Sequence, residues 1–291
     1  MGSLPEVNGP EPLKSKLKCA VSHQPGLEHA AIAVLVLTAL TIMGAHYLAP
    51  AGYEQQFRDM PQAAPSIHHP LGTDELGRDR WARLLYGMRV SLVLAPLAAL
   101  FTTVLAGLVG GIAGYFGGWT ERCCKLLIDL FLSVPWLFLL ITVRAVLPLN
   151  VSPEASVTVT FALLGLLGWA ASARVICAGA KDLMKSEFVW MARASGFSGF
   201  RLVRLHLLPN LRGALLAQFW ISIPVFIIAE ANLGALGLGV AEPLPSLGSL
   251  LRELQDAVML RPEPWRLLPL AVLIVVISSF QVLLNKQEGR T

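Results

Sequence analysis

The chain has 291 residues, of which 55% are hydrophobic and only 14% are charged, and its mean hydropathy is +0.62. A soluble domain of ordinary composition has about 25% charged residues, so this composition excludes a soluble globular protein and indicates an integral membrane protein. The formal net charge is only +4, and we expect the chain to contact the lipid bilayer and no nucleic acid.

The apolar residues are arranged in long runs. A helix needs about 20 apolar residues to cross a hydrocarbon layer of about 30 Å. The sequence therefore predicts an all-α, polytopic bundle of about six transmembrane helices. The expected spans are residues 30–49, 90–116, 126–147, 156–178, 214–236 and 267–284. They form one transmembrane domain, 30–284, between an N-terminal tail, 1–29, and a C-terminal tail, 285–291.

Basic residues predict the orientation of the bundle. An even number of spans places both termini on one side, and Lys and Arg are concentrated in the N-terminal tail and in the loop 179–213. The positive-inside rule therefore favours cytoplasmic termini, an inner loop at 179–213 and an outer loop at 50–89. The cysteines all lie on or near the inner side, so we expect no disulfide framework; they are Cys19, Cys123, Cys124 and Cys177.

The outer loop leads into the second span through HPLGTDELGRDRWARLLYGMRVSL, residues 69–92. Thr73 is expected to cap a helix whose first turn carries Asp74 and Glu75, because acids are favoured at a helix N-terminus. Gly72 and Gly77 are expected at tight backbone turns.

The same segment is rich in arginine. We expect its arginines to form exposed ion pairs, individually worth about 0–1 kcal/mol, with Asp74, Glu75 and Asp79; they are Arg78, Arg80, Arg83 and Arg89. The neighbouring His68 and His69 make a poor metal site without further ligands. We expect no metal site there.

Three charged residues lie near the ends of the third and fourth spans. Snorkelling of the side chain to the lipid headgroups is the simplest explanation for Asp129, Arg144 and Arg174.

The inner loop contains EFVWMARASGFSGFRLVRLHLLPN, residues 187–210. An apolar stripe of Phe188, Met191, Ala192 and Ser195 has helical spacing, and Gly196 follows where a helix can end in a left-handed conformation. A second helix is expected, capped by Ser198, carrying the basic residues Arg201 and Arg204, and stopped by Pro209.

This helix–turn–helix is too short to bury its own apolar stripe. It must be covered by the membrane, by its own bundle or by a partner. An interfacial amphipathic helix with its arginines at the lipid phosphates is one interpretation, and docking on a partner is the other.

Glu230, in the fifth span, is the leading functional candidate within the membrane, because ionisable groups there are expensive and usually functional. It lies near the outer end of the span, where it either faces a solute path or shapes an outer gate. An interfacial Glu that is hydrogen-bonded to nearby backbone is the alternative. Gln218, nearer the inner end, is a second candidate for lining a path.

The inner loop resembles the EAA loop of ABC importer permeases. The resemblance rests on Glu187, the AlaArgAla string 192–194, Gly196, His206 and the LeuLeuProAsn string 207–210, which are similar to the dipeptide, oligopeptide and nickel branch of that family.

Two further segments support this resemblance. GlyThrAspGluLeuGlyArgAsp, residues 72–79, resembles the outer segment of the family before its second span. AlaGluAlaAsnLeuGlyAlaLeuGlyLeuGlyVal, residues 229–240, is similar to the exit of its fifth span and contains Gly234, Gly237 and Gly239. Together the similar segments run from about residue 66 to 270.

The resemblance implies the membrane-spanning permease subunit of an ABC importer in the bacterial inner membrane. Its implied partners are a homologous second permease, two cytoplasmic ATPase subunits and an extracytoplasmic solute-binding protein. Peptides, or a small solute such as a nickel chelate, would cross by alternating access. The loop would dock on the ATPase through Trp190, Met191, Ala192, Gly196, Arg201, His206, Leu208 and Pro209, with a gate at Glu230 and the Gly-rich exit.

Two positions depart from the family pattern. Trp190 and Met191 stand where the EAA motif has Glu and its first Ala. Since that Glu helps to shape the loop in the family, we expect an atypical ATPase interface here.

Two other classes of protein are alternatives to a transporter. One is a membrane scaffold whose loop recruits a cytosolic protein. The other is an intramembrane enzyme, which needs a nucleophile and a base within hydrogen-bond reach. The sequence contains no phosphate-binding GxxxxGK[ST] loop, no HExxH and no GxSxG. We therefore expect no catalytic residue, cofactor or metal site, with ATP hydrolysed by partner subunits.

Overall fold

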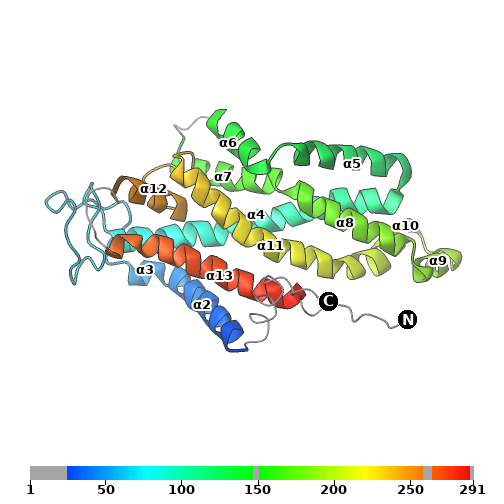
Figure 1. The fold of residues 1–291 in the computed structure, drawn as a ribbon, viewed down its shortest axis with the longest axis horizontal. Coiled ribbons are helices and arrows are strands. Elements are labelled where there is room, and N and C mark those ends of the chain that lie inside the picture. Colours follow the sequence, from blue (N-terminus) through cyan, green and yellow to red (C-terminus); the bar gives the residue numbers. More distant parts are fainter. Residues whose placement is uncertain (1–24, 147–150, 258–263, 289–291) are drawn as a thin grey trace, which may run out of the picture. The chain divides into compact units, whose positions relative to one another are not determined.

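The computed structural model describes residues 25–146, 151–257 and 264–288, which are mostly helical (Figure 1). In chain order the helices are α2 (Pro25–Met43), α3 (Ala45–Leu48), α4 (Arg80–Phe116), α5 (Gly118–Ser133), α6 (Trp136–Val146), α7 (Pro153–Leu167), α8 (Trp169–Met184), α9 (Glu187–Ala194), α10 (Gly199–Leu202), the π-helix η1 (Val203–Leu207), α11 (Leu208–Ala235), α12 (Leu247–Ala257), the 3-10 helix η2 (Pro264–Leu267) and α13 (Leu268–Glu288). Within the described ranges no strand forms, and two isolated β-bridges join residues of the outer loop.

The chain divides into two units. The smaller contains residues 1–40 and 272–291, and the larger contains residues 41–271. The smaller unit contributes most of α2 and α13, which are apolar on nearly every side. The larger unit contains the remaining helices and both segments that the sequence analysis identified as functional.

The expected number of spans is confirmed. Five helical segments of the described chain are long and apolar enough to cross a membrane, and a sixth span results if the bent pair α5–α6 is counted as one. The five are residues 26–43, 80–116, 153–184, 199–235 and 264–285. The second begins ten residues earlier than predicted, at Arg80, because the outer arginines are part of the helix.

The third span is not the continuous helix that was predicted for residues 126–147. It breaks after Ser133 into α5 and α6, which are bent by 77°. Pro135 follows the break, and it disfavours a helical conformation at Val134, which is extended.

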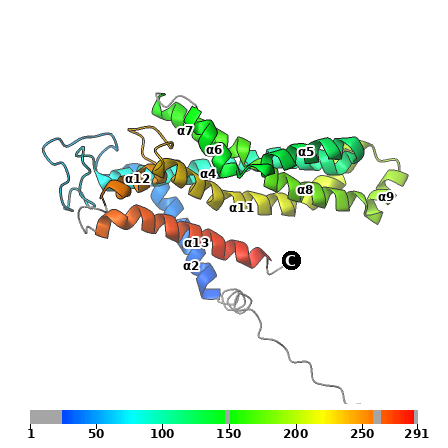
Figure 2. The ribbon, with the colours of Figure 1, turned by 45° about the horizontal axis from the view of Figure 1, so that its top comes forward.

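Small residues hold α4 against α8 inside the larger unit. A Cβ atom at Gly110 would lie 2.5 Å from the carbonyl oxygen of Ala173, and one at Gly114 would lie 2.4 Å from the Cβ of Ala180. Helices in lipid gain stability from such close backbone contact rather than from hydrophobic burial. In both views α4, α8 and α11 run side by side (Figures 1 and 2).

The C-terminal end of α11 makes an equally close contact with α12. A Cβ atom at Gly234 would lie 2.2 Å from the backbone carbon of Gly248, and one at Gly239 would lie 2.7 Å from the Cα of Gly234. The Gly-rich exit of the fifth span therefore lets the chain fold back and pack α12 onto α11.

We expect Gly234→Ala to lower the free energy of unfolding by about 1–3 kcal/mol, the usual cost of overpacking, because α11 and α12 must separate to admit the methyl group. Gly213→Ala in the same helix is the matched control, since a Cβ at Gly213 meets no atom within 4 Å. Thermal unfolding of the full chain in detergent measures both variants. Equal melting temperatures for the two would contradict the close approach of α11 and α12.

Candidate functional site

The outer segment, residues 50–79, is folded around two of its glycines, Gly72 and Gly77. Gly72 and Gly77 have φ angles of +70° and +74°, which confirms that they form tight turns. A Cβ atom at Gly72 would lie 2.2 Å from the carbonyl oxygen of Ala63, and one at Gly77 would lie 2.2 Å from that of Phe57. No other residue type fits at either position without moving the backbone.

The predicted role of Thr73 as a helix cap is wrong. Its hydroxyl donates to the carbonyl of Met60 at 2.5 Å and accepts from the N–H of Ala63 at 2.8 Å. Thr73 therefore links two parts of the outer loop to each other. The cap of α4 is Asp79, whose carboxylate accepts from the N–H of Ala82 at 2.9 Å. The helix therefore starts six residues later than Thr73 would have placed it, after the turn at Gly77.

Asp79 also fixes His69. The Nδ1 atom of His69 lies 2.6 Å from Oδ2 of Asp79, and both side chains are buried. His69 therefore already has a protein partner. No group of three or more potential metal ligands occurs in the described part of the chain.

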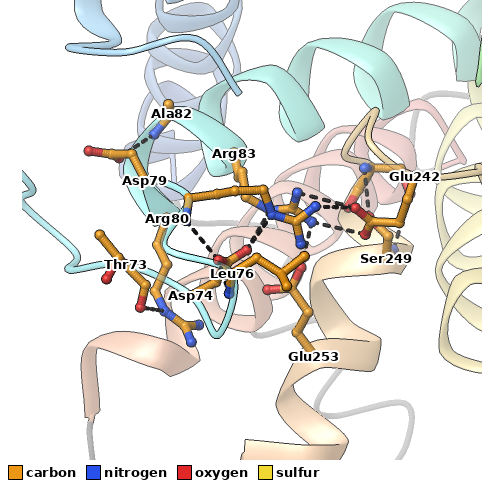
Figure 3. Close-up of polar contacts among 12 residues, drawn as sticks. Thr73, Asp74, Leu76, Asp79, Arg80, Ala82, Arg83, Glu242, Ser249 and Glu253 are labelled. Atoms are coloured by element: carbon orange, nitrogen blue, oxygen red, sulfur yellow. Dashed lines mark hydrogen bonds and ion pairs between the residues drawn. The ribbon is translucent and has the colours of Figure 1, made fainter. Parts of the chain in front are cut away.

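Five charged residues form what we name the outer charge cluster: Asp74, Arg78, Arg83, Glu242 and Glu253 (Figure 3). Arg83, on the first turn of α4, donates from Nη2 to Glu242 at 3.1 Å and to Glu253, on α12, at 2.5 Å. Arg78 donates from Nε to Asp74 at 2.6 Å and also contacts Glu242. The cluster therefore joins the outer segment, α4 and α12.

The expectation of exposed, weak ion pairs is wrong for the Asp74 and Arg83 pairs of this cluster. The side chains of Arg83, Asp74 and Arg78 are 0%, 5% and 8% exposed, respectively, whereas those of Glu253 and Glu242 are 26% and 55% exposed. Breaking a buried pair by removal of one partner typically costs about 3–5 kcal/mol, because the other charge is left uncompensated. The sequence placed these arginines correctly but could not show that acids more than 150 residues away cover them.

The two distant acids titrate differently. Burial raises the pKa of Glu242, but the guanidinium groups of Arg83 and Arg78 lower it by a larger amount. The net pKa of Glu242 therefore lies below the ordinary value. Burial raises the pKa of Glu253 above the ordinary value, and the charge of Arg83 offsets only part of this rise.

Glu230 lies at the junction of three helices and is completely buried. Its Oε2 atom accepts from the hydroxyl of Ser91, on α4, at 2.8 Å, and that hydroxyl accepts from the N–H of Leu247, the first residue of α12, at 3.0 Å. Its Oε1 atom is buried beside the turn before α12 without a hydrogen bond of good geometry. Glu230 thus links α11 to α4 and to α12.

The other residues of the expected gate lie in different surroundings. Gly234 and Gly239 are part of the contact with α12, and Gly237, at φ +75°, packs against the guanidinium of Arg252. Gln218 is half-buried, and its carbonyl accepts from the hydroxyl of Ser222. Because Gln218 precedes Glu230 on α11 by several helical turns, the two residues do not share a site.

Snorkelling does not explain Arg144. The residue is 1% exposed, and its Nη2 atom donates to the hydroxyl of Ser156 at 2.9 Å and to the carbonyl of Gly239 at 3.2 Å. The side chain points into the protein because α7 and the Gly-rich exit offer it acceptors. Asp129 and Arg174 pair with each other at 2.5 Å, which the sequence analysis also did not predict.

The helix–turn–helix of the inner loop is partly confirmed. Helix α9 ends at Ala194, and Gly196 follows in the left-handed conformation, with φ +79°. Ser198 precedes α10, but its side chain makes no capping hydrogen bond. Pro209 does not stop the second helix. It occupies the first turn of α11, where backbone N–H groups have no acceptor within the helix, so the missing N–H of proline breaks no hydrogen bond.

The second helix is therefore continuous with the fifth span. Helix α10 passes through η1 into α11, and this whole run, residues 199–235, behaves as one apolar helical segment. His206 lies in η1, with its ring 5.5 Å from that of Phe197, and the guanidinium of Arg201 stacks over the same Phe197 ring at 5.1 Å.

The buried side of α9 differs from the predicted stripe. Val189 and Ala192 are covered by Leu202, Tyr115 and Met184, so the larger unit shelters one flank of the helix. The predicted Met191 points outward. Four large apolar side chains of α9 and α10 remain exposed, by 40–77%: Phe188, Trp190, Met191 and Phe200. We name these four residues the α9 surface; they lie at the end of the larger unit opposite α12 (Figures 1 and 2).

Comparison with known proteins gives a consistent result. Residues 106–287 match the family described as "Binding-protein-dependent transport system inner membrane component". The chain is 31% identical over 249 residues to the oligopeptide transport system permease protein OppC of Mycobacterium tuberculosis, which covers 85% of this chain and 84% of that protein.

Two further relatives are similar over nearly the same length. The dipeptide transport system permease protein DppC of Bacillus subtilis is 31% identical over 86% of this chain and 76% of its own. The glutathione transport system permease protein GsiD of Pectobacterium atrosepticum is 30% identical over 86% of this chain and 83% of its own.

We expect Arg83→Gln to destabilise the protein by about 3–5 kcal/mol, because Glu253 loses the guanidinium that is hydrogen-bonded to it and Glu242 keeps only Arg78. Arg89→Gln, on the exposed side of the same helix, is the matched control and should change the free energy of unfolding by less than about 0.5 kcal/mol. Thermal unfolding in detergent measures both, and unaltered stability of Arg83→Gln would contradict the energetic role of the outer charge cluster.

Acid should weaken the same cluster. Because the folded pKa of Glu242 lies below the ordinary value, its contribution to stability is present above pH about 4.3, the unfolded value, and is lost as the pH falls through the folded pKa. We expect the melting temperature of the wild type to fall over this range and that of Glu242→Gln to fall less. If the melting temperatures of the two proteins fall in parallel as the pH is lowered, ionised Glu242 does not contribute to stability.

Proposed function

Since this chain belongs to the family of inner-membrane components of binding-protein-dependent transport systems, and is the permease subunit of an ABC importer, we propose that its cargo is a peptide, or a related small solute such as a nickel chelate. The observation that carries the proposal is that relatives similar over most of the chain are named for oligopeptide, dipeptide and glutathione transport. The number of spans and the open apolar surface at α9 agree with a subunit of a larger transporter.

The proposed assembly contains a homologous second permease, two cytoplasmic ABC ATPases and an extracytoplasmic solute-binding protein, in a bacterial inner membrane. The termini and α9 would then face the cytoplasm, as the distribution of Lys and Arg favours. ATP would be hydrolysed by the partner subunits, and this chain would supply the membrane path.

The α9 surface is the proposed docking site for the ATPase. Apolar side chains as exposed as Trp190, Met191 and Phe200 mark an interaction site when they are contiguous. Val189 and Ala192 fix α9 to Tyr115 and Met184, so a displacement of α9 moves the ends of α4 and α8. Since α10 and η1 continue into α11, the same displacement also reaches the fifth span.

The far end of α11 is the proposed outer gate. Glu230 and Gly234 lie there, against α12. Alternating access needs two arrangements of the spans and a partner that binds one of them better. In this proposal the ATPase supplies the differential binding energy through α9, and the contact of α11 with α12 and Ser91 is the element that changes at the gate.

The function is tested by co-purification and uptake. We expect the full chain to co-purify with an ATPase and a second permease, and cells that express the set to accumulate a labelled di- or tripeptide. Trp190→Glu should abolish ATPase co-purification and uptake, because a charge replaces the exposed indole. Trp190→Phe, which keeps an aromatic ring at the same position, is the matched control and should retain both.

Two results would overturn this proposal. If Trp190→Glu co-purifies as much ATPase as the wild type, the α9 surface is not the docking site. Co-purification without uptake of any peptide would indicate the membrane scaffold instead of the peptide importer.

A further inference from the structure

Helices α5 and α8 each carry charged residues along one side. On α5 these are Glu121, Lys125 and Asp129, spaced by four residues, and on α8 they are Arg174, Lys181 and Asp182. Residues at such spacings share one face of a helix. Between the two faces lies a hollow of about 360 Å³, which we name the α5–α8 groove. It is lined by Lys125, Ile128, Asp129, Arg174, Cys177, Ala178, Lys181 and Asp182.

Ion pairs span this groove at two levels. Oε1 of Glu121 accepts from Lys125 and from Lys181, each at 2.6 Å. Nη2 of Arg174 donates to Asp129 at 2.5 Å, and both of these side chains are 60% exposed. The groove therefore presents charges of both signs, and the Asp129–Arg174 pair is open to its surroundings.

The exposed pair lies within the third and fourth expected spans, residues 126–147 and 156–178. Asp129 is ten residues beyond the exposed Trp119, which corresponds to a rise of about 15 Å along the helix, and Arg174 is seven residues from Lys181, or about 10 Å. The side chain of Asp129 has a single methylene group, which is too short for it to snorkel along the helix. Arg174 could snorkel, but its guanidinium is held at Asp129.

Lipid is a poor neighbour for this face. Each charge placed at the centre of a membrane helix costs about 2.5–3.5 kcal/mol on insertion scales. The other side of α5 is apolar and open, since Leu127 and Leu130 are 44% and 66% exposed. Helix α5 therefore has one face that suits lipid and another, around Asp129, that suits water.

We propose that the α5–α8 groove is a water-filled part of the solute path that binds a zwitterionic solute. Its ammonium group would lie against Asp129 and its carboxylate against Arg174, and the volume of the groove falls at the lower end of the range of ligand sites, about 300–1,000 Å³. This proposal rests on the proposed transport function and assigns to it a binding site on this chain.

Thiol labelling tests whether the groove is aqueous. In the full chain, expressed with the subunits that co-purify with it, the four native cysteines are replaced by serine, and either Ala178→Cys or Leu130→Cys is introduced. Ala178 lines the groove, whereas Leu130, one residue after Asp129, is on the far face of α5 and is 66% exposed. The probe is a cationic, membrane-impermeant methanethiosulfonate.

We expect the thiol of Ala178→Cys to react faster than that of Leu130→Cys by on the order of tenfold or more, because water surrounds the first and lipid the second. Modification of Ala178→Cys should also block uptake. Equally slow reaction at both positions would overturn the proposal, because it would mean that lipid or another protein chain covers the groove.

Protection by solute tests the binding site. A dipeptide should slow the labelling of Ala178→Cys several-fold, a C-terminally amidated dipeptide should protect less, and addition of Arg174→Gln should remove that difference. Equal protection by acid and amide would overturn the role of Arg174. If the intact transporter carries no peptide, the proposed function fails, while the labelling ratio still decides whether the groove contains water.

Discussion

Hydrocarbon cannot drive apolar helices together, and this constraint decides how the larger unit is built. Its spans are held by backbone contacts that only small residues allow. Gly110 and Gly114 bring α4 against α8, and Gly234 brings α11 against α12. The polar links depend on these contacts: Ser91 reaches both Glu230 and the start of α12 only because the three helices meet so closely.

The two ends of the larger unit have opposite physical characters. At one end, the outer charge cluster and the turns at Gly72 and Gly77 tie the outer segment to α4 and α12 through buried, charge-assisted hydrogen bonds. At the other end, α9 covers one flank and leaves the α9 surface open. In the proposed transporter, the tied end faces outward and the open α9 surface binds the ATPase, so a displacement of α9 would reach the far end of the spans.

Charges inside the spans fall into two groups. Glu230 and Arg144 are almost completely buried and are hydrogen-bonded to hydroxyl or carbonyl groups. Asp129 and Arg174 are paired yet exposed. Buried polar groups can be explained by the stability of the fold alone, since a partner offsets their desolvation. An exposed pair within the expected spans needs surroundings that are not lipid, which is why the proposed binding site is at the α5–α8 groove rather than at Glu230.

The sequence by itself determined the class of protein, the number of spans, the turns at Gly72, Gly77 and Gly196, and the segment that forms α9. These features depend on local properties, namely hydropathy, helical length and the steric freedom of glycine. The tertiary structure alone decided that Asp79 rather than Thr73 caps α4, because the preceding loop captures the Thr73 hydroxyl. It also decided which acids bind Arg83 and that Arg144 points inward. Those partners come from segments far along the chain, and no local pattern shows which of them will meet once the helices pack.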